Sequence, residues 1–327
     1  MLVLLLSLGH GLAPPQDASR VLERAVSRSP YATLVGVTAI WGSQHSVIRW
    51  AVGEGDPEAL TALRFSVAAA CLAPFAPRDP ETWRAGAELG VWSFLGFALQ
   101  AVGLETTTAT RSAFLLYLNV KLVPVVGLAR GKRASIGVWA SAACALCGTT
   151  LLTTDRVGAF VVGDAWSLAA AVASAIFIVR LEDLAKGKDS AELAAATAAT
   201  TALLALLWSG PPEPTPDVLL ASVYLGAFPS AACGFLQTAA QKYLSAPRAA
   251  VVYALDPLWA YFFAYILLGE TLQPRAAFGA TLVAIAALGP PVAAAITDPR
   301  RLQQPADDVY ADETREIKNA TDKGTES

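Results

Sequence analysis

The chain has 327 residues, of which 54% are hydrophobic and only 16% are charged. A soluble domain usually carries charge on about 25% of its residues, and a soluble fold of this length could not bury the long apolar runs found here. The net charge of −3 is too small to indicate a nucleic-acid partner, so the composition predicts an integral membrane protein.

The first 30 residues differ from the apolar segments that follow. An apolar run over 2–8 is too short to span a bilayer, and three arginines come after it, Arg20, Arg24 and Arg28. One interpretation is a signal or organelle-targeting leader. The other is a short amphipathic tail on the cytosolic side, and the pattern favours both equally.

Ten later segments are long and apolar enough to cross a bilayer, whose hydrocarbon core takes roughly 20 residues of helix. They are 31–50, 57–76, 88–106, 110–129, 135–153, 163–181, 190–208, 218–240, 248–268 and 275–296. No alternation of apolar and polar residues is long enough to build a β-barrel. The predicted fold class is therefore all-α with ten transmembrane helices, followed by a polar and disordered tail over 298–327.

The basic residues of the connecting loops favour a cytosolic N-terminus. With ten helices both termini are then cytosolic. That side carries fifteen basic residues: Arg20, Arg24, Arg28, Arg78, Arg84, Arg130, Lys132, Arg133, Arg180, Lys186, Lys188, Lys242, Arg248, Arg300 and Arg301. The other side carries only Arg49, Arg111, Arg156 and Arg275.

The chain also resembles itself at an offset of 137 residues. Gln100 aligns with Gln237, and Asn119 aligns with Asp256. Further upstream the offset is 131 and pairs Ser43 with Ser174. These pairings indicate that the first, third and fourth helices correspond to the sixth, eighth and ninth.

Five helices in each copy is an odd number, so the two copies must have opposite orientations in the membrane. We therefore predict inverted repeats over 31–154 and 163–297, with Arg111 and Arg248 on opposite sides. Inverted repeats are a known route to alternating access, with the substrate site near the midplane between them.

Several stretches resemble the EamA-type family of the drug/metabolite transporter superfamily. They are Ala-Ile-Trp-Gly-Ser at 39–43, Leu-Thr-Ala-Leu-Arg-Phe at 60–65, the segment 103–114, Leu-Asp-Pro-Leu-Trp-Ala at 255–260 and Leu-Gly-Glu at 268–270. The resemblance covers about 31–297 and implies ten helices in two repeats and transport of a small metabolite, without specifying which one. It departs at 131–132, where Gly-Lys stands in place of the family's usual Gly-Glu.

Two ionisable residues fall inside predicted membrane helices. Each costs about 2.5–3.5 kcal/mol on insertion scales and normally faces a cavity or a partner. Lys121 lies in the fourth segment and Asp256 lies in the ninth. They form either a substrate or ion site or a structural salt bridge, and the sequence leaves both open.

Polar and aromatic residues on the same and neighbouring helices complete the candidate substrate or ion site. They are Trp41, Gln44, His45, Gln100, Tyr117, Asn119, Gln237 and Tyr253. Arg64 is interpreted instead as an anchor at the membrane interface, because a long arginine side chain reaches the headgroups from near a helix end. Cys144 and Cys147 are interpreted as small packing residues.

The leading functional hypothesis is a secondary transporter that moves a small metabolite by alternating access. The alternatives are a membrane scaffold or receptor and an intramembrane enzyme. No G-x-x-x-x-G-K-[ST], G-x-S-x-G or H-E-x-x-H pattern occurs, so we expect no enzyme activity, no cofactor and no metal. The expected partners are a small-molecule metabolite and membrane lipid, and a homodimer is compatible with them. The membrane is either the plasma membrane or that of an organelle such as a plastid.

Overall fold

The computed structural model describes residues 15–51, 57–104, 106, 115–116, 118–131, 136–153, 161–212 and 214–256, with scattered positions from 258 to 286. Within these ranges the chain forms helices and turns and no strand. The predicted all-α class is confirmed for this part of the chain. The predicted tail over 298–327 lies outside the described residues.

The described residues of the first half form six helices and one short 3₁₀ turn. They are α2 (Pro15–Arg28), α3 (Pro30–Ala51), α4 (Pro57–Leu72), η1 (Ala73–Phe75), α5 (Pro80–Leu104), α7 (Asn119–Ala129) and α8 (Ile136–Thr153). The second half contains α9 (Val162–Leu184), α10 (Ser190–Ser209), α11 (Pro216–Leu225), the π-helix η2 (Gly226–Ala232), α12 (Cys233–Gln241) and α13 (Ala246–Tyr253).

Five segments of the described chain are long and apolar enough to cross a membrane. They are Pro57–Phe75, Pro80–Gly103, Val162–Leu184, Ser190–Ser209 and Pro216–Gln241. Four of them agree to within three residues at both ends with the predicted segments 57–76, 163–181, 190–208 and 218–240. The chain is therefore an integral, multi-pass membrane protein.

The start of α5 differs from the prediction, which placed it at residue 88. The helix begins at Pro80, because Asp79 accepts a hydrogen bond from the Thr82 backbone N–H at 2.7 Å. A side chain in this position satisfies an N–H that the first helical turn leaves free, and proline suits the first helical position. The helix thus extends beyond the apolar segment.

Two other helices begin with the same chemistry. Asp189 accepts hydrogen bonds from the N–H groups of Ala191 and Glu192 at the start of α10. Thr215 accepts one from Val218 at the start of α11, where Pro216 occupies the first position. Capping residues next to proline or serine therefore set these boundaries as strongly as hydropathy does.

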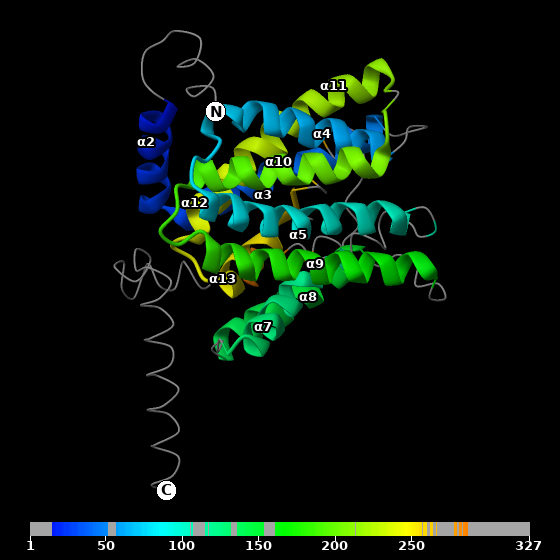
Figure 1. Ribbon diagram of the computed structural model, residues 1–327. Coiled ribbons are helices and arrows are strands. Elements are labelled where there is room, and N and C mark those ends of the chain that lie inside the picture. Colours follow the sequence, from blue (N-terminus) through cyan, green and yellow to red (C-terminus); the bar gives the residue numbers. More distant parts are fainter. Residues whose placement is uncertain are drawn as a thin grey trace, which may run out of the picture.

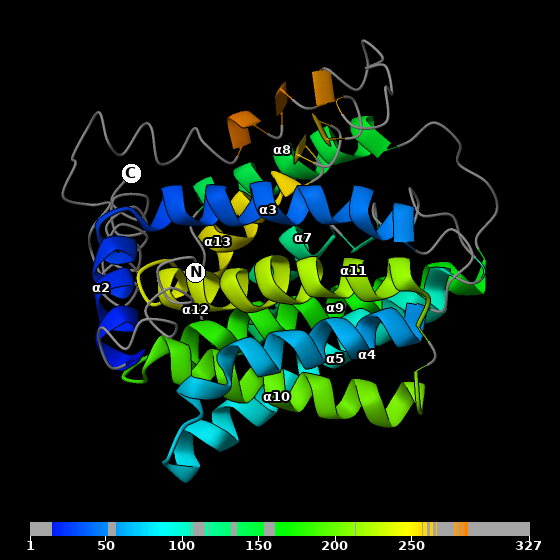
Figure 2. The same ribbon diagram turned by 90° about the horizontal axis from the view of Figure 1, so that it is seen from above.

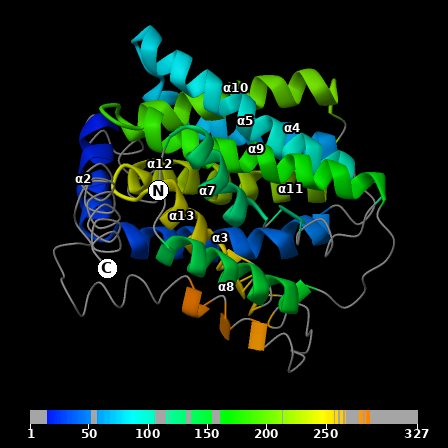
Figure 3. The same cartoon turned by 90° about the horizontal axis from the view of Figure 1, so that it is seen from below.

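The long helices pack side by side in a bundle. The helices α4, α10, α5 and α9 lie next to one another in that order (Figure 1). The helix α3 lies against α11 and α12 (Figure 2), and α7 and α13 lie between α9 and α8 (Figure 3). The described parts of both halves of the chain thus interleave in one bundle.

Small residues bring α5 and α10 into close contact. Gly86 and Gly90 form a G-x-x-x-G on α5, and a Cβ at Gly90 would lie only 2.5 Å from the Cβ of Thr200. A Cβ at Gly86 would overlap that of Ala196. Such close backbone approach is how membrane helices gain packing energy where burial from water offers none.

The helix contacts recur when the two halves of the chain are exchanged. In the predicted repeat, α3 corresponds to α9, α4 to α10, α5 to the segment of α11, η2 and α12, and α7 to α13. The contact of α5 with α9 has its counterpart in that of α12 with α3. The contact of α7 with α9 corresponds to that of α13 with α3, and α4 packs on its own counterpart α10.

The helix α2 lies across one end of the bundle (Figure 1). Ser19 and Val26 are buried against the bundle, whereas Arg20, Arg24 and Arg28 are exposed. The described part of the N-terminal region is thus an amphipathic helix with a basic outer face.

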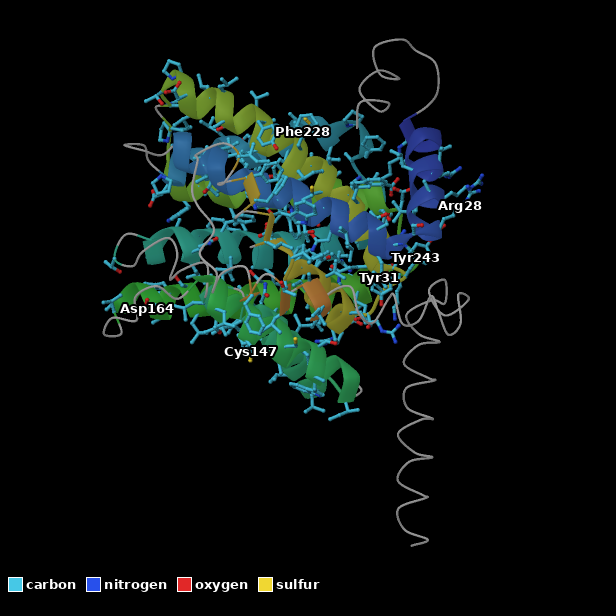
Figure 4. The ribbon with its side chains drawn as sticks, turned by 180° about the vertical axis from the view of Figure 1, so that it is seen from behind. Arg28, Tyr31, Cys147, Asp164, Phe228 and Tyr243 are labelled. Carbon is cyan, nitrogen blue, oxygen red and sulfur yellow. The ribbon has the colours of Figure 1, made fainter. Side chains whose placement is uncertain are left out.

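Ion pairs gather at this same end. Glu23 of α2 accepts from Lys242 Nζ at 2.5 Å, and Lys188 pairs with Glu81 at 2.7 Å. Deeper in the bundle, Arg180 pairs with Glu88 and Asp183. Lys188 and Lys242, which were assigned to the cytosolic side, therefore lie at the same end as the arginines of α2. Asp164 lies at the opposite end from Arg28 (Figure 4).

Candidate functional site

Arg64 is buried near the middle of α4, with only 6% of its surface exposed. Its Nε donates a hydrogen bond to Ser230 Oγ at 2.6 Å, and its Nη2 donates one to Gln44 Oε1 at 2.8 Å. The interpretation of Arg64 as an interfacial anchor is wrong. Neighbouring helices enclose its side chain at mid-span, so the guanidinium bonds inside the bundle instead of reaching the headgroups.

Aromatic rings line the Arg64 side chain. The guanidinium carbon lies 4.9 Å from the ring centre of Phe97 on α5 and 5.5 Å from that of Phe65. Both distances are within the range of cation–π attraction. Every ion pair found among the described residues involves other basic groups, so the groups that contact Arg64 there are neutral.

The partner segment η2 is a π-helix, a wide turn that often occurs at functional sites. Pro229 lies inside it and has no N–H to donate, which favours a local departure from α-helical bonding. The Pro229 carbonyl accepts a hydrogen bond from Trp41 Nε1 at 3.0 Å, and the next residue, Ser230, binds Arg64. The sequence indicated this proline only as part of an apolar segment, and the wide turn was not predicted.

A second polar group adjoins the first through Trp41. The rings of Trp41 and Tyr253 lie 5.3 Å apart, and Tyr253 donates a hydrogen bond to Gln241 Oε1 at 3.0 Å. Gln237 Nε2 lies 3.4 Å from the same oxygen, and Gln241 Nε2 donates to the Ile178 carbonyl. The structure therefore brings together Trp41, Gln237 and Tyr253, which the sequence selected, with Gln241, which it did not.

Asp256 lies three residues after the end of α13 and is buried, with 8% of its surface exposed. Gln100 and Asn119 are half-buried on α5 and at the start of α7. No bond joins either of them to the group around Trp41 and Tyr253 among the contacts of the described residues.

Three selected residues cannot be placed in this arrangement. Tyr117 lies outside the described residues, as do the side chains of Lys121 and His45, although their backbones belong to α7 and α3. The pairing of Lys121 with Asp256 therefore stays a prediction.

The two cysteines of the C-x-x-C pattern are free thiols. Cys144 is half-buried on α8. Cys147 is exposed on the same helix (Figure 4). Within the described ranges no three His, Cys, Asp or Glu side chains come together as metal ligands would.

Comparison with known proteins identifies the family. Two stretches, 28–154 and 161–289, match the model of the EamA-like transporter family. The chain belongs to this family. In this EamA-like protein, Gln44 and Arg64 come from the first match, whereas Ser230 and Tyr253 come from the second.

Two further similarities agree with this result. An "Uncharacterized transporter" of Archaeoglobus fulgidus is 28% identical over 263 residues, which covers 77% of this chain and 82% of the relative. A solved crystal structure with 21% sequence identity aligns with a TM-score of 0.67 over 82% of this chain and 98% of the other. The first supports transport as the general activity, and the second supports the fold alone.

Proposed function

We propose that this protein is a secondary transporter that moves a small metabolite by alternating access between two inverted five-helix repeats. Its family and its relative already make it a membrane transporter in general terms. The observation that carries the finer proposal is the polar group of Arg64, Gln44 and Ser230, because Arg64 is buried at mid-span and its partners come from both halves of the chain.

The helix contacts support the inverted repeats. The contacts of α5 with α9 and of α7 with α9 have counterparts in those of α12 with α3 and of α13 with α3, as a pseudo-two-fold axis requires. With five helices per half that axis lies in the membrane plane, and the segments around it are where such transporters bind their substrates.

Two features support a rocking motion around this site. The wide turn of η2 interrupts regular helical bonding beside Arg64, which suits it to absorb a change of backbone angle. Ion pairs among Arg130, Arg180, Glu88 and Asp183 connect the end of α7 with α9 and α5, inward of the pairs at the α2 end of the bundle. We propose that these pairs close that end in one of the two states.

Solute flux into proteoliposomes tests the proposal. We expect at least one metabolite from a broad panel to enter in a saturable, protein-dependent manner, and to exchange with the same metabolite loaded inside. Solutes that stabilise the purified protein against heat are measured first, since a bound ligand raises stability. If such a solute binds but never crosses, the protein is a receptor or scaffold and the transport proposal is wrong.

A further inference from the structure

We infer that the guanidinium of Arg64 is the binding group for an oxyanion, so that the metabolite moved by this protein carries a carboxylate or a phosphate. This inference rests on the proposed transport function and specifies the chemical class of its substrate. Nothing in the sequence pattern selected Arg64 for this role.

The charge of Arg64 lacks a counter-charge in the described structure. Its contacts are the amide oxygen of Gln44, the hydroxyl of Ser230 and two aromatic rings. Arg180, in contrast, pairs with the carboxylates of Glu88 and Asp183. A buried ion that meets only neutral groups recovers less of its desolvation cost than an ion pair does. An anionic ligand can therefore form with Arg64 the ion pair that no described protein carboxylate forms.

The donor geometry leaves part of the guanidinium available. Arginine has five N–H donors in a rigid fork, and the bonds to Ser230 and Gln44 use one hydrogen of Nε and one of Nη2. Nη1 has no acceptor among the described residues. Both hydrogens of Nη1 and one of Nη2 are therefore left, and a guanidinium binds the two oxygens of a carboxylate or phosphate through such paired N–H groups.

The site is also asymmetric between the repeats. At the offsets of 131 to 137 that relate the two halves, Arg64 corresponds to residues 195–201, which are all alanine or threonine. A charge needed only for helix packing would have no reason to differ so sharply between two halves with matching contacts. A substrate with one anionic group needs only one such charge.

The side chains around Arg64 indicate which groups would contact the rest of a bound metabolite. Gln44 and Ser230 hold the guanidinium from opposite halves of the chain, so the position of the charge depends on how the halves are arranged. Trp41 donates a hydrogen bond to the carbonyl next to Ser230, and its ring packs at a tilt against that of Tyr253. A metabolite whose anionic group binds Arg64 therefore has aromatic and amide groups beside its remaining atoms.

Thermal unfolding of the purified full-length protein, followed by tryptophan fluorescence, tests the inference. The probes are succinate and glutamate as carboxylates, inorganic phosphate and glycerol phosphate as phosphates, and succinamide and putrescine as neutral and cationic controls, at equal ionic strength. We expect carboxylates or phosphates, and neither control, to raise the melting temperature of the wild type. The arm that responds identifies the oxyanion, and no response in either arm overturns the inference.

Variants locate the effect. Arg64→Met should weaken the binding of the responding anion about 10- to 100-fold, since hydrogen bonds to charged groups are of that strength. Arg84→Met, at an exposed arginine of α5, is the matched control and should bind as the wild type does. If Arg64→Met does not fold, Arg64→Lys answers the same question, because it keeps the charge and loses the fork. Full anion binding in either Arg64 variant overturns the inference.

Flux separates this inference from the proposed function. Protein that binds the anion at Arg64 but does not carry it across the bilayer supports the site and contradicts transport. Protein that carries a neutral or cationic solute, with equal rates in the wild type and Arg64→Met, supports transport and contradicts the anion site.

Discussion

Arg64 and Gly226 meet where α4 crosses η2, and the position of the guanidinium depends on this crossing. A Cβ at Gly226 would lie 2.6 Å from the Arg64 carbonyl oxygen and 2.5 Å from the Val67 Cβ. Real Cβ atoms do not approach other atoms so closely, so only glycine lets the two segments pack at this distance. The hydrogen bond between the Arg64 and Ser230 side chains follows from this close approach.

We expect Gly226→Ala to destabilise the protein by about 1–3 kcal/mol, the usual effect of extra volume in a packed interior. The matched control is Gly234→Ala on α12, where an added Cβ meets nothing within 4 Å. Thermal unfolding in detergent compares the two variants. Equal melting temperatures for both would show that α4 and η2 shift apart without cost.

Lys121 and Asp256 provide a second prediction at this scale. Removing one member of a buried pair typically costs about 3–5 kcal/mol, whereas replacing both is often close to neutral. We therefore expect Lys121→Met and Asp256→Leu to reduce folded protein singly, and the double replacement to restore much of it. If the two single effects simply add, the residues are not partners. A folded double variant with normal flux would make the pair structural only.

At the scale of the element, the start of α5 depends on one carboxylate. Asp79 accepts the Thr82 backbone N–H, and this bond holds the pKa of Asp79 below its usual value. Because the pKa of Asp79 is lower in the folded than in the unfolded chain, its carboxylate stabilises the protein at pH values above the ordinary aspartate pKa of about 3.9. That contribution is lost as the pH falls through the lowered pKa.

We expect Asp79→Ala to lower the melting temperature at neutral pH, because the first turn of α5 loses its cap. Asp79→Asn is the control, since asparagine caps a helix but does not titrate. The difference in melting temperature between the wild type and Asp79→Asn should shrink as the pH is lowered from 6 to 3. A constant difference over this range would show that the carboxylate charge makes no contribution.

At the scale of the whole molecule, several contacts between the described helices of the two halves recur when the halves are exchanged. Contacts of α5 with α9 and of α12 with α3 recur on exchange, and the candidate site lies where the halves meet. The basic residues of α2 and of the loops beside it gather at one end. Both features follow if five-helix halves are inserted with opposite orientations.

Cysteine labelling from either side of the membrane tests this orientation. In a background without native cysteines, Arg111→Cys and Arg248→Cys should react with a membrane-impermeant reagent from opposite sides. Both termini should face the cytosol, so the Asn319-Ala320-Thr321 sequon should carry no glycan in a secretory-pathway host. Labelling of both cysteines from the same side would rule out the five-plus-five arrangement.

The sequence by itself determined the membrane class, the family and most helix positions in the described chain. These depend on a local quantity, the length of an apolar segment against the thickness of the bilayer. It also selected Trp41, Gln237 and Tyr253, because polar and aromatic groups in an apolar segment are conspicuous. The same local reasoning placed the start of α5 eight residues too late, since it weighed hydropathy above the cap at Asp79.

Only the tertiary structure decided what Arg64 does. Its bonds join it to Gln44, 20 residues away, and to Ser230, 166 residues away, and no local pattern encodes a contact at that separation. The wide turn at Pro229 is stabilised by Trp41, 188 residues distant. An arginine in an apolar helix either reaches the headgroups or forms hydrogen bonds inside the bundle. The packing of the neighbouring helices decides between these two conformations. The neighbouring helices enclose the Arg64 side chain, so its charge lies at the centre of the candidate site.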